Sequence, residues 1–166
     1  MADPAGGWLY CEISFMATRM IKSPSIDPRH ACFRLGIRES RIHRRGVYAL
    51  EPIPAHRKVI EYTGERLNRR EAKRRGQGSV TYLFSIDDYW TLDGAVGGSG
   101  AEIINHSCDP NLRSCVLKGH ILYISKRPIR RDEELTVDYR FSDRIDRIRC
   151  CCKSENCRGT INLKPE

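Results

Sequence analysis

The sequence contains no long apolar run, no internal repeat and no low-complexity segment. No stretch approaches the roughly 20 apolar residues that a membrane-spanning helix needs, so we expect no membrane contact. The first twenty residues begin with Asp3 rather than a cation, and Glu12 interrupts their only apolar stretch, so they do not resemble a secretory signal. We therefore predict an intracellular protein.

Composition places the chain among ordinary globular domains. Its 166 residues are 40% hydrophobic and 30% charged, which suits one domain with a packed core and excludes a disordered chain. The net charge is +8. Such a surface suits an anionic partner such as nucleic acid, although a solvated basic face explains the charge equally well. Cations are densest in one cluster: Arg66, Arg69, Arg70, Lys73, Arg74 and Arg75.

Cysteine is in clear excess. Of the eight cysteines, half crowd the C-terminal part of the sequence: Cys150, Cys151, Cys152 and Cys157. Because nothing indicates secretion, they predict a metal site rather than a disulfide framework. A structural zinc ion needs four ligands, and the spacing Cys150-x-Cys152-x4-Cys157 supplies three of them. The extra Cys151 leaves the register open.

Short runs of β-branched and aromatic residues follow one another after residue 33, separated by glycine and proline. This pattern predicts a mostly β domain made of several small sheets. A short helix is also expected near 100–104, and residues 1–33 are expected to form a partly ordered lead-in. The expected strands are 47–50, 58–62, 80–86, 90–92, 120–124 and 134–139.

One longer helix interrupts this β pattern. Asn68 is a good N-cap, residues 69–75 are good helix formers, and Gly76 is a good C-terminal stop. Glu71 and Arg75 are spaced to pair across one helical turn. The segment has little apolar surface, so we expect it on the outside of the domain.

Four motifs precede the cysteine cluster in a fixed order: SRIHRRGVYA (Ser40–Ala49), EYTGE (Glu61–Glu65), INHSCDPN (Ile104–Asn111) and EELTVDY (Glu133–Tyr139). Together they resemble the SET-domain family of protein lysine methyltransferases, most closely its trithorax-like group with a post-SET zinc motif. The resemblance covers roughly residues 34–162. It implies a SET fold, in which several small β-sheets surround a pseudoknot that joins the third and fourth motifs. The implied organisation is a lead-in at 1–33, a SET domain at 34–141 and a post-SET zinc segment at 142–166.

The resemblance implies transfer of a methyl group from S-adenosylmethionine to a lysine, above all on a histone tail. The lysine amine must first lose its proton, which at pH 7 costs roughly 4–5 kcal/mol for an exposed lysine. An apolar channel lowers that cost, and tyrosine hydroxyls at its end aim the nitrogen. By resemblance Tyr139 and Tyr62 are catalytic, and Phe84, Val137 and Phe141 line the channel. Val137 is small where relatives carry Phe or Tyr, so we expect di- or trimethylation.

The resemblance also assigns the cofactor and metal sites. The metal is expected to tie the C-terminal segment across the core and to help assemble the site without acting as the catalyst. One structural Zn²⁺ is expected on Cys108, Cys150, Cys152 and Cys157. S-adenosylmethionine is expected to contact His43, Arg44, Arg45, Gly46, Tyr82, Asn105, His106, Tyr139 and Cys151.

Two residues depart from the family pattern: Arg44 replaces a glycine, and Glu102 replaces an arginine. They keep two alternatives open, namely a catalytically weak or inactive SET module that binds chromatin or nucleic acid, and a methyltransferase for a non-histone protein. We expect a nuclear, chromatin-associated protein if the source is eukaryotic or the protein acts in a host, and a cytoplasmic one if it is bacterial. A groove for a basic histone tail must be acidic, and the candidate carboxylates are Glu61, Glu65, Asp87, Asp88 and Asp93.

Overall fold

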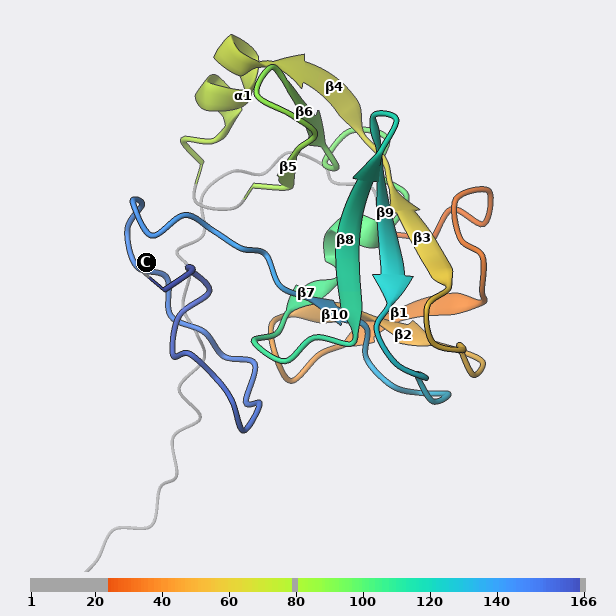
Figure 1. The fold of residues 1–166 in the computed structure, drawn as a ribbon. Coiled ribbons are helices and arrows are strands. Elements are labelled where there is room, and N and C mark those ends of the chain that lie inside the picture. The colour runs from red at the N-terminus through yellow and green to blue at the C-terminus, as the bar shows by residue number, and fades with distance from the viewer. Residues whose placement is uncertain (1–23, 79–80, 165–166) are drawn as a thin grey trace, which may run out of the picture.

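The computed structural model describes residues 24–78 and 81–164, which form small β-sheets with little helix (Figure 1). Most of the expected lead-in at 1–33 lies outside the described residues. No helix among them is long and apolar enough to cross a membrane. The elements in chain order are β1 (Leu35–Glu39), β2 (Arg45–Ala49), β3 (Lys58–Tyr62), β4 (Glu65–Asn68), α1 (Arg69–Arg75), β5 (Leu83–Ser85), β6 (Trp90–Asp93), the 3₁₀ helix η1 (Ala101–Ile103), β7 (Asn105–His106), β8 (Leu112–Leu117), β9 (His120–Ser125) and β10 (Thr136–Val137).

The centre of the fold is an antiparallel sheet with the strand order β3-β9-β8. Its strand β9 alternates as a sheet with one face on a core does, with Ile121 and Tyr123 buried and His120 exposed. The hairpin of β1 and β2 packs on the same core through Val47 and Ala49. Burial of these aliphatic side chains is the main favourable contribution to this part of the fold.

A smaller sheet, β4-β6-β5, carries the helix α1 (Figure 1). The Asn68 side chain accepts a hydrogen bond from the Glu71 N–H at 3.0 Å, which confirms the predicted N-cap. Arg75 pairs with Glu71 at 2.9 Å, as the spacing predicts, and also with Asp93 at 2.6 Å. No residue of α1 is buried, so the helix lies on the outside of the domain as expected.

The third and fourth sequence motifs meet in the short parallel pair of β7 and β10. Asn111 fastens them, because its Oδ1 accepts from the Thr136 N–H at 2.9 Å and its Nδ2 donates to the Glu134 carbonyl at 2.8 Å. The Ser107 N–H adds a bond to the Val137 carbonyl at 3.1 Å. The predicted mostly β fold, in which small sheets bring these two motifs side by side, is confirmed.

The six expected strands are all present, and β3 matches its predicted range residue for residue. The expected short helix near 100–104 is present as η1. The sequence pattern misses β1, β4, β7 and β8, each of which is an edge strand of its sheet. Edge strands bury less of their surface and tolerate charge, and charged side chains break the apolar pattern in β1 (Arg38, Glu39) and β4 (Glu65, Arg66).

Candidate functional site

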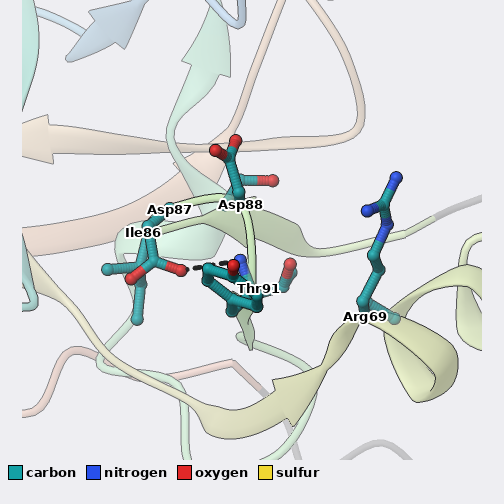
Figure 2. Close-up of a pocket in the computed structure, with 8 residues that line it drawn as sticks. Arg69, Ile86, Asp87, Asp88 and Thr91 are labelled. Carbon is teal, nitrogen blue, oxygen red and sulfur yellow. Dashed lines mark hydrogen bonds between the residues drawn. The ribbon is translucent and has the colours of Figure 1, made fainter.

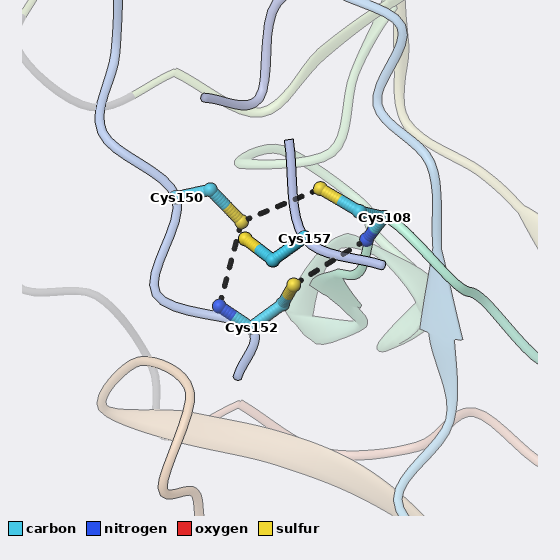
Figure 3. Close-up of side chains that lie close together, drawn as sticks. All are labelled: Cys108, Cys150, Cys152 and Cys157. Atoms are coloured by element: carbon cyan, nitrogen blue, oxygen red, sulfur yellow. Dashed lines mark hydrogen bonds between the residues drawn. The ribbon is translucent and has the colours of Figure 1, made fainter. Parts of the chain in front are cut away.

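Four cysteine sulfur atoms lie together where the C-terminal segment meets the third motif (Figure 3). The Sγ atoms of Cys108, Cys150, Cys152 and Cys157 all lie within 4.8 Å of one another, and those of Cys108 and Cys150 are 3.7 Å apart. A tetrahedral zinc ion with Zn–S bonds of about 2.3 Å sets its ligands about 3.8 Å apart. The four residues therefore fit one zinc ion, and a complete thiolate set indicates a structural rather than a catalytic metal.

Every sulfur atom of this cluster also accepts a backbone hydrogen bond. Such N–H donors stabilise thiolates and orient metal ligands, which supports the same assignment. The backbone N–H groups of Arg158, Cys152, Cys108 and Gly159 lie 3.3, 3.4, 3.5 and 3.4 Å from the Sγ atoms of Cys108, Cys150, Cys152 and Cys157, respectively. The geometry places Cys151 outside the four-sulfur group.

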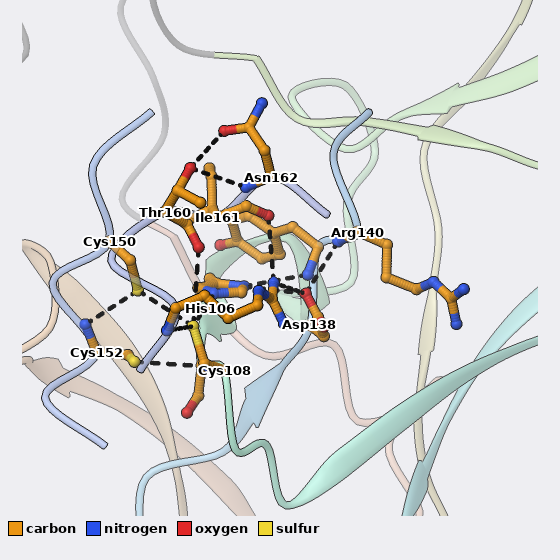
Figure 4. A network of polar contacts seen from close by, with 12 residues as sticks. His106, Cys108, Asp138, Arg140, Cys150, Cys152, Thr160, Ile161 and Asn162 are labelled. Carbon is orange, nitrogen blue, oxygen red and sulfur yellow. Dashed lines mark hydrogen bonds and ion pairs between the residues drawn. The ribbon is translucent and has the colours of Figure 1, made fainter. Parts of the chain in front are cut away.

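His106 connects the cysteine cluster to Tyr139, and Figure 4 shows its ring beside Cys108. Its Nδ1 accepts a hydrogen bond from the Tyr139 N–H at 3.2 Å, and its Nε2 lies 3.4 Å from Cys108 Sγ. A neutral imidazole with its proton on Nε2 satisfies both contacts. Burial lowers the pKa of His106 to about 4, so the ring is neutral near pH 7. The position of Cys108 is therefore coupled through one side chain to the backbone of Tyr139.

An ion pair holds the C-terminal segment against the chain just before Tyr139 (Figure 4). The Arg158 guanidinium donates to both carboxylate oxygens of Asp138, at 2.8 and 2.9 Å. Although burial opposes ionisation, the hydrogen bonds and charge of Arg158 hold the pKa of Asp138 below its usual value. Only 16% of the Arg158 side chain is exposed, so water screens this pair less than a surface pair.

Aromatic rings surround the second motif. The ring of Tyr62 lies 5.4 Å from Phe84 and 6.2 Å from Tyr123, and Phe84 and Tyr123 are also 6.2 Å apart. The Tyr139 ring lies 5.7 Å from that of Phe141. These residues supply the apolar walls that a lysine channel needs. Val137, the third expected channel residue, is buried in β10 with 2% exposure.

The hydroxyls of the two expected catalytic tyrosines both donate to backbone carbonyls. Tyr62 donates to the Tyr82 carbonyl at 2.5 Å, and Tyr139 donates to the Ile104 carbonyl at 2.9 Å. Burial raises the pKa of both hydroxyls, although part of the Tyr139 residue is exposed. Each hydroxyl is a neutral phenol whose single proton is already engaged, so it offers lone pairs to a further ligand.

Sequence reasoning missed Tyr123 as a member of this aromatic group. The residue is 2% exposed, and burial raises its pKa well above the usual value. The signal was present in the β9 sequence HILYIS, because Ile121 and Tyr123 occupy alternate positions that face the core.

The loop at residues 40–46 lies against Asn105. The Asn105 Nδ2 donates to the Arg45 carbonyl at 2.9 Å and lies 3.3 Å from the His43 carbonyl. A Cβ on Gly46 would overlap the carboxylate of Glu134, so a larger residue at that position would have to displace this carboxylate. The expected cofactor residues of the first and third motifs are therefore brought together, with backbone carbonyls and an amide available to a polar ligand.

The two departures from the family pattern have local explanations. Arg44 has φ 42°, the left-handed region that the family's glycine adopts freely and that other residues adopt at a cost. Glu102 replaces an arginine, and its Oε2 accepts a hydrogen bond from the Gly100 N–H at 2.8 Å. Burial raises the pKa of Glu102. Its carboxylate closes the turn that leads into η1.

A hollow with a volume of about 820 Å³ lies beside β5 and α1 (Figure 2). Arg69, Ile86, Asp87, Asp88 and Thr91 are among the residues that line it. The hollow is open to solvent, and neither Tyr62 nor Tyr139 lines it. The strand β5 connects the hollow to the aromatic group around Tyr62, because the central residue of β5 is Phe84.

The candidate groove carboxylates differ in their partners. Asp93 pairs with Arg75 at 2.6 Å, and Glu61 contacts His120 at 2.6 Å. The Asp87 carboxylate accepts the N–H groups of the turn that follows it. Asp88, in contrast, has no ion-pair partner among residues 24–78 and 81–164, which makes it the most available carboxylate in the hollow.

Comparison with known proteins agrees with this geometry. The SET-domain profile matches residues 44–140. Over 160 residues the chain is 37% identical to the human histone-lysine N-methyltransferase SETD1A. It is 39% identical over 137 residues to trithorax of Drosophila virilis and 41% identical over 140 residues to the histone H3-lysine(4) N-trimethyltransferase ATX1 of Arabidopsis thaliana. These matches include 90%, 77% and 78% of this chain but 9%, 4% and 13% of the relatives.

Proposed function

Because this chain belongs to the SET-domain family, we propose that it is a protein-lysine N-methyltransferase that uses S-adenosylmethionine and acts on a histone. The observation that carries this proposal is the pair of tyrosine hydroxyls, Tyr62 and Tyr139, whose protons are engaged by backbone carbonyls beside an aromatic wall. The methyltransferase names of the relatives support the same reading.

The tyrosine pair suits the handling of an amine. An exposed lysine has a pKa of about 10.4, and burial among Tyr62, Phe84 and Tyr139 lowers it because the charged form loses its hydration. The engaged hydroxyls of Tyr62 and Tyr139 accept the amine N–H groups and leave the nitrogen lone pair free to face the methyl donor. When bound, S-adenosylmethionine supplies the electrophilic methyl group.

The cofactor is proposed to bind between the loop and β7. The loop residues His43, Arg44, Arg45 and Gly46 offer backbone groups, and Asn105 and His106 approach from the opposite side. Tyr82, Tyr139 and Cys151 are proposed to complete the site. A polar ligand with an amino-acid end needs such carbonyl and amide partners.

The substrate is proposed to lie along β5. In the described part of the chain, no other strand pairs with the outer edge of β5, so an extended peptide can add there as a further strand. The acidic hollow suits the basic residues of a histone tail. We expect Asp88→Lys to raise the KM for a basic peptide several-fold, with the exposed Glu39→Lys as the control. An unchanged KM would contradict this groove.

Val137 supports a proposal about the product. A buried valine leaves more room near the amine than a larger aromatic side chain does, so di- or trimethylated lysine is the expected product. Mass spectrometry of a peptide substrate at long reaction times measures this directly. A product that stops at monomethyl-lysine would show that another group limits the space.

We also propose that the protein contacts nucleic acid while it is bound to a histone. Basic residues on and beside α1 support this second proposal. Arg66 stacks on the Trp90 ring with 4.4 Å between the guanidinium carbon and the ring centre, and Arg69, Arg70 and Lys73 are exposed. Basic side chains interleaved with aromatic rings suit a phosphate backbone. The same surface would serve a catalytically inactive chromatin-binding module.

The salt dependence of DNA binding tests the role proposed for α1. Replacing Arg69, Arg70 and Lys73 with glutamine is expected to weaken binding and to reduce the salt slope by about 0.9 for each phosphate that the variant no longer neutralises. The control removes the same charge from exposed Arg113, Lys118 and Lys126. If the two variants weakened DNA binding equally, the binding would depend on net charge alone and not on the position of α1.

A methyl-transfer assay with radiolabelled S-adenosylmethionine tests the main proposal. The substrates are core histones and whole nucleosomes, and the proteins are wild type, Tyr139→Phe and the exposed Val116→Ala as a control. We expect label on one histone, strongly reduced in the Tyr139 variant alone. Cofactor binding without histone labelling would favour a non-histone substrate, and the absence of cofactor binding would favour the inactive module.

A further inference from the structure

Glu134 belongs to the fourth motif, yet the chemistry proposed above gives its side chain no role. Its half-buried carboxylate accepts hydrogen bonds from three neutral donors. The Ser40 hydroxyl lies 2.8 and 3.0 Å from its two oxygens, the Tyr48 hydroxyl donates at 3.0 Å and the Asn105 Nδ2 donates at 2.8 Å. No lysine, arginine or histidine of the described chain forms an ion pair with it. The neighbouring Glu133, in contrast, pairs with Arg127 at 2.7 Å.

Two of these donors, Ser40 and Asn105, also shape the loop at residues 40–46. The Ser40 Oγ accepts the Ile42 N–H at 2.9 Å at the start of the loop. The Asn105 Nδ2 donates to the Arg45 carbonyl at 2.9 Å at its end. The carboxylate therefore joins both ends of the loop to Asn105, one of the residues proposed to bind the cofactor.

The loop needs such an anchor. Arg44 adopts φ 42° without the freedom of a glycine, so the loop conformation is maintained by contacts around it. Gly46 lies directly on the Glu134 carboxylate, and a Cβ at that position would displace the carboxylate. The loop and the carboxylate are thus shaped to one another.

We propose that Glu134 is a positioning residue that holds the loop at 40–46 and the Asn105 side chain in the conformation that binds the amino-acid end of S-adenosylmethionine. This inference rests on the proposed function. The lysine channel is built from other residues, and Glu134 makes no hydrogen bond to Tyr62 or Tyr139 within the described residues. Loss of Glu134 is therefore expected to affect cofactor binding and to spare peptide binding.

The neighbouring residue provides a matched control. Glu134→Gln and Glu133→Gln remove the same charge from adjacent positions, and the Glu133 side chain contacts Asn111 and Arg127 rather than the loop. Calorimetry with S-adenosylhomocysteine is expected to show affinity reduced about tenfold or more in Glu134→Gln, the effect of hydrogen bonds to a charged group. Glu133→Gln is expected to bind about as tightly as wild type.

Kinetics and a second substitution separate positioning from general damage. Glu134→Gln is expected to raise the KM for S-adenosylmethionine while the peptide KM stays unchanged. Ser40→Ala is expected to weaken cofactor binding by itself and to add little to Glu134→Gln, because the two side chains act through one network. Ser40→Ala also tests the proposal if Glu134→Gln fails to fold.

Three results would overturn the inference: wild-type cofactor affinity in both the Glu134 and Ser40 variants, equal reductions in the Glu133 and Glu134 variants, or a peptide KM that rises with that of the cofactor. Failure of the proposed function is distinguishable from these, because it appears in the wild-type protein as an absence of cofactor binding.

Discussion

The central sheet β3-β9-β8 buries Ile60, Leu112 and Ile121 completely, whereas no aliphatic or aromatic side chain between residues 142 and 164 is buried. The C-terminal segment relies on polar contacts instead. The Asn162 Nδ2 donates to the Ser142 carbonyl at 2.9 Å, and the Thr160 hydroxyl donates to the Ile148 carbonyl at 2.8 Å. The C-terminal segment also contains three of the four clustered cysteines.

This difference indicates which of the two regions depends on a bound metal for its stability. Apolar burial stabilises the central sheet whenever the chain is in water. A segment without an apolar core offsets its loss of conformational entropy mainly through metal binding, so its folding is coupled to zinc. The segment reaches Tyr139 through His106 and Arg158. Tyr139, the proposed catalytic tyrosine, is therefore positioned partly by the less stable of the two regions.

Removing the metal is expected to have the largest effect. Structural zinc contributes about 10–16 kcal/mol in small zinc domains, so chelation or Cys150→Ser should unfold residues 142–164 and lower methyl transfer by about a hundredfold or more. The central sheet should remain folded. Hydrogen exchange of 142–164 against that of β9 measures the comparison directly. The exposed Cys32→Ser is the control. Continued protection of residues 142–164 without metal would contradict the prediction that their folding requires zinc.

A cavity in the core should produce the opposite pattern. Ile121→Ala removes a fully buried side chain and is expected to lower the free energy of unfolding by about 2–5 kcal/mol. Zinc affinity, measured by competition with a chelator in the folded protein, should change little because the two sites are independent. Val116→Ala, on the exposed part of β8, is the control. A matching loss of zinc affinity would mean that the two regions fold as one unit.

The contact between the regions is tested by Arg158→Lys. Lysine keeps the charge but cannot reproduce the two parallel hydrogen bonds to Asp138. We expect methyl transfer to fall by about tenfold, with zinc content unchanged, because a bidentate pair is stronger than a single charged contact. Single-turnover rates and metal analysis measure the two quantities, and Arg144→Lys, on the exposed part of the segment, is the control. Unchanged rates would show that zinc alone positions Tyr139.

Local sequence signals were sufficient for much of the fold. Short runs of β-branched and aromatic residues located β3 and β9, and the Asn68 cap located α1. The edge strand β4 was missed because its pairing with β6 depends on a partner more than twenty residues away. Short polar strands carry no pattern of their own.

The candidate site divides in the same way. The motif resemblance indicated Cys108, although it lies over forty residues from Cys150 in sequence. No pattern indicated the engaged protons of Tyr62 and Tyr139 or the three donors around Glu134. Those contacts join segments that are distant in sequence and become neighbours only in the folded chain; the pairing of β7 with β10, for example, brings Glu134 close to Asn105.

The smallest expected effect concerns α1, which depends neither on the core nor on the metal. Asn68→Ala removes the side-chain acceptor of the Glu71 N–H and should destabilise the helix by about 1 kcal/mol. Because α1 buries no residue, faster hydrogen exchange should be confined to residues 69–75. Asn68→Asp keeps an acceptor oxygen and should behave like wild type. A change in the hydrogen-exchange rate of β9 or of residues 142–164 would show that the helix is coupled to one of the two regions. The helix, the central sheet and the C-terminal segment would then not act independently of one another.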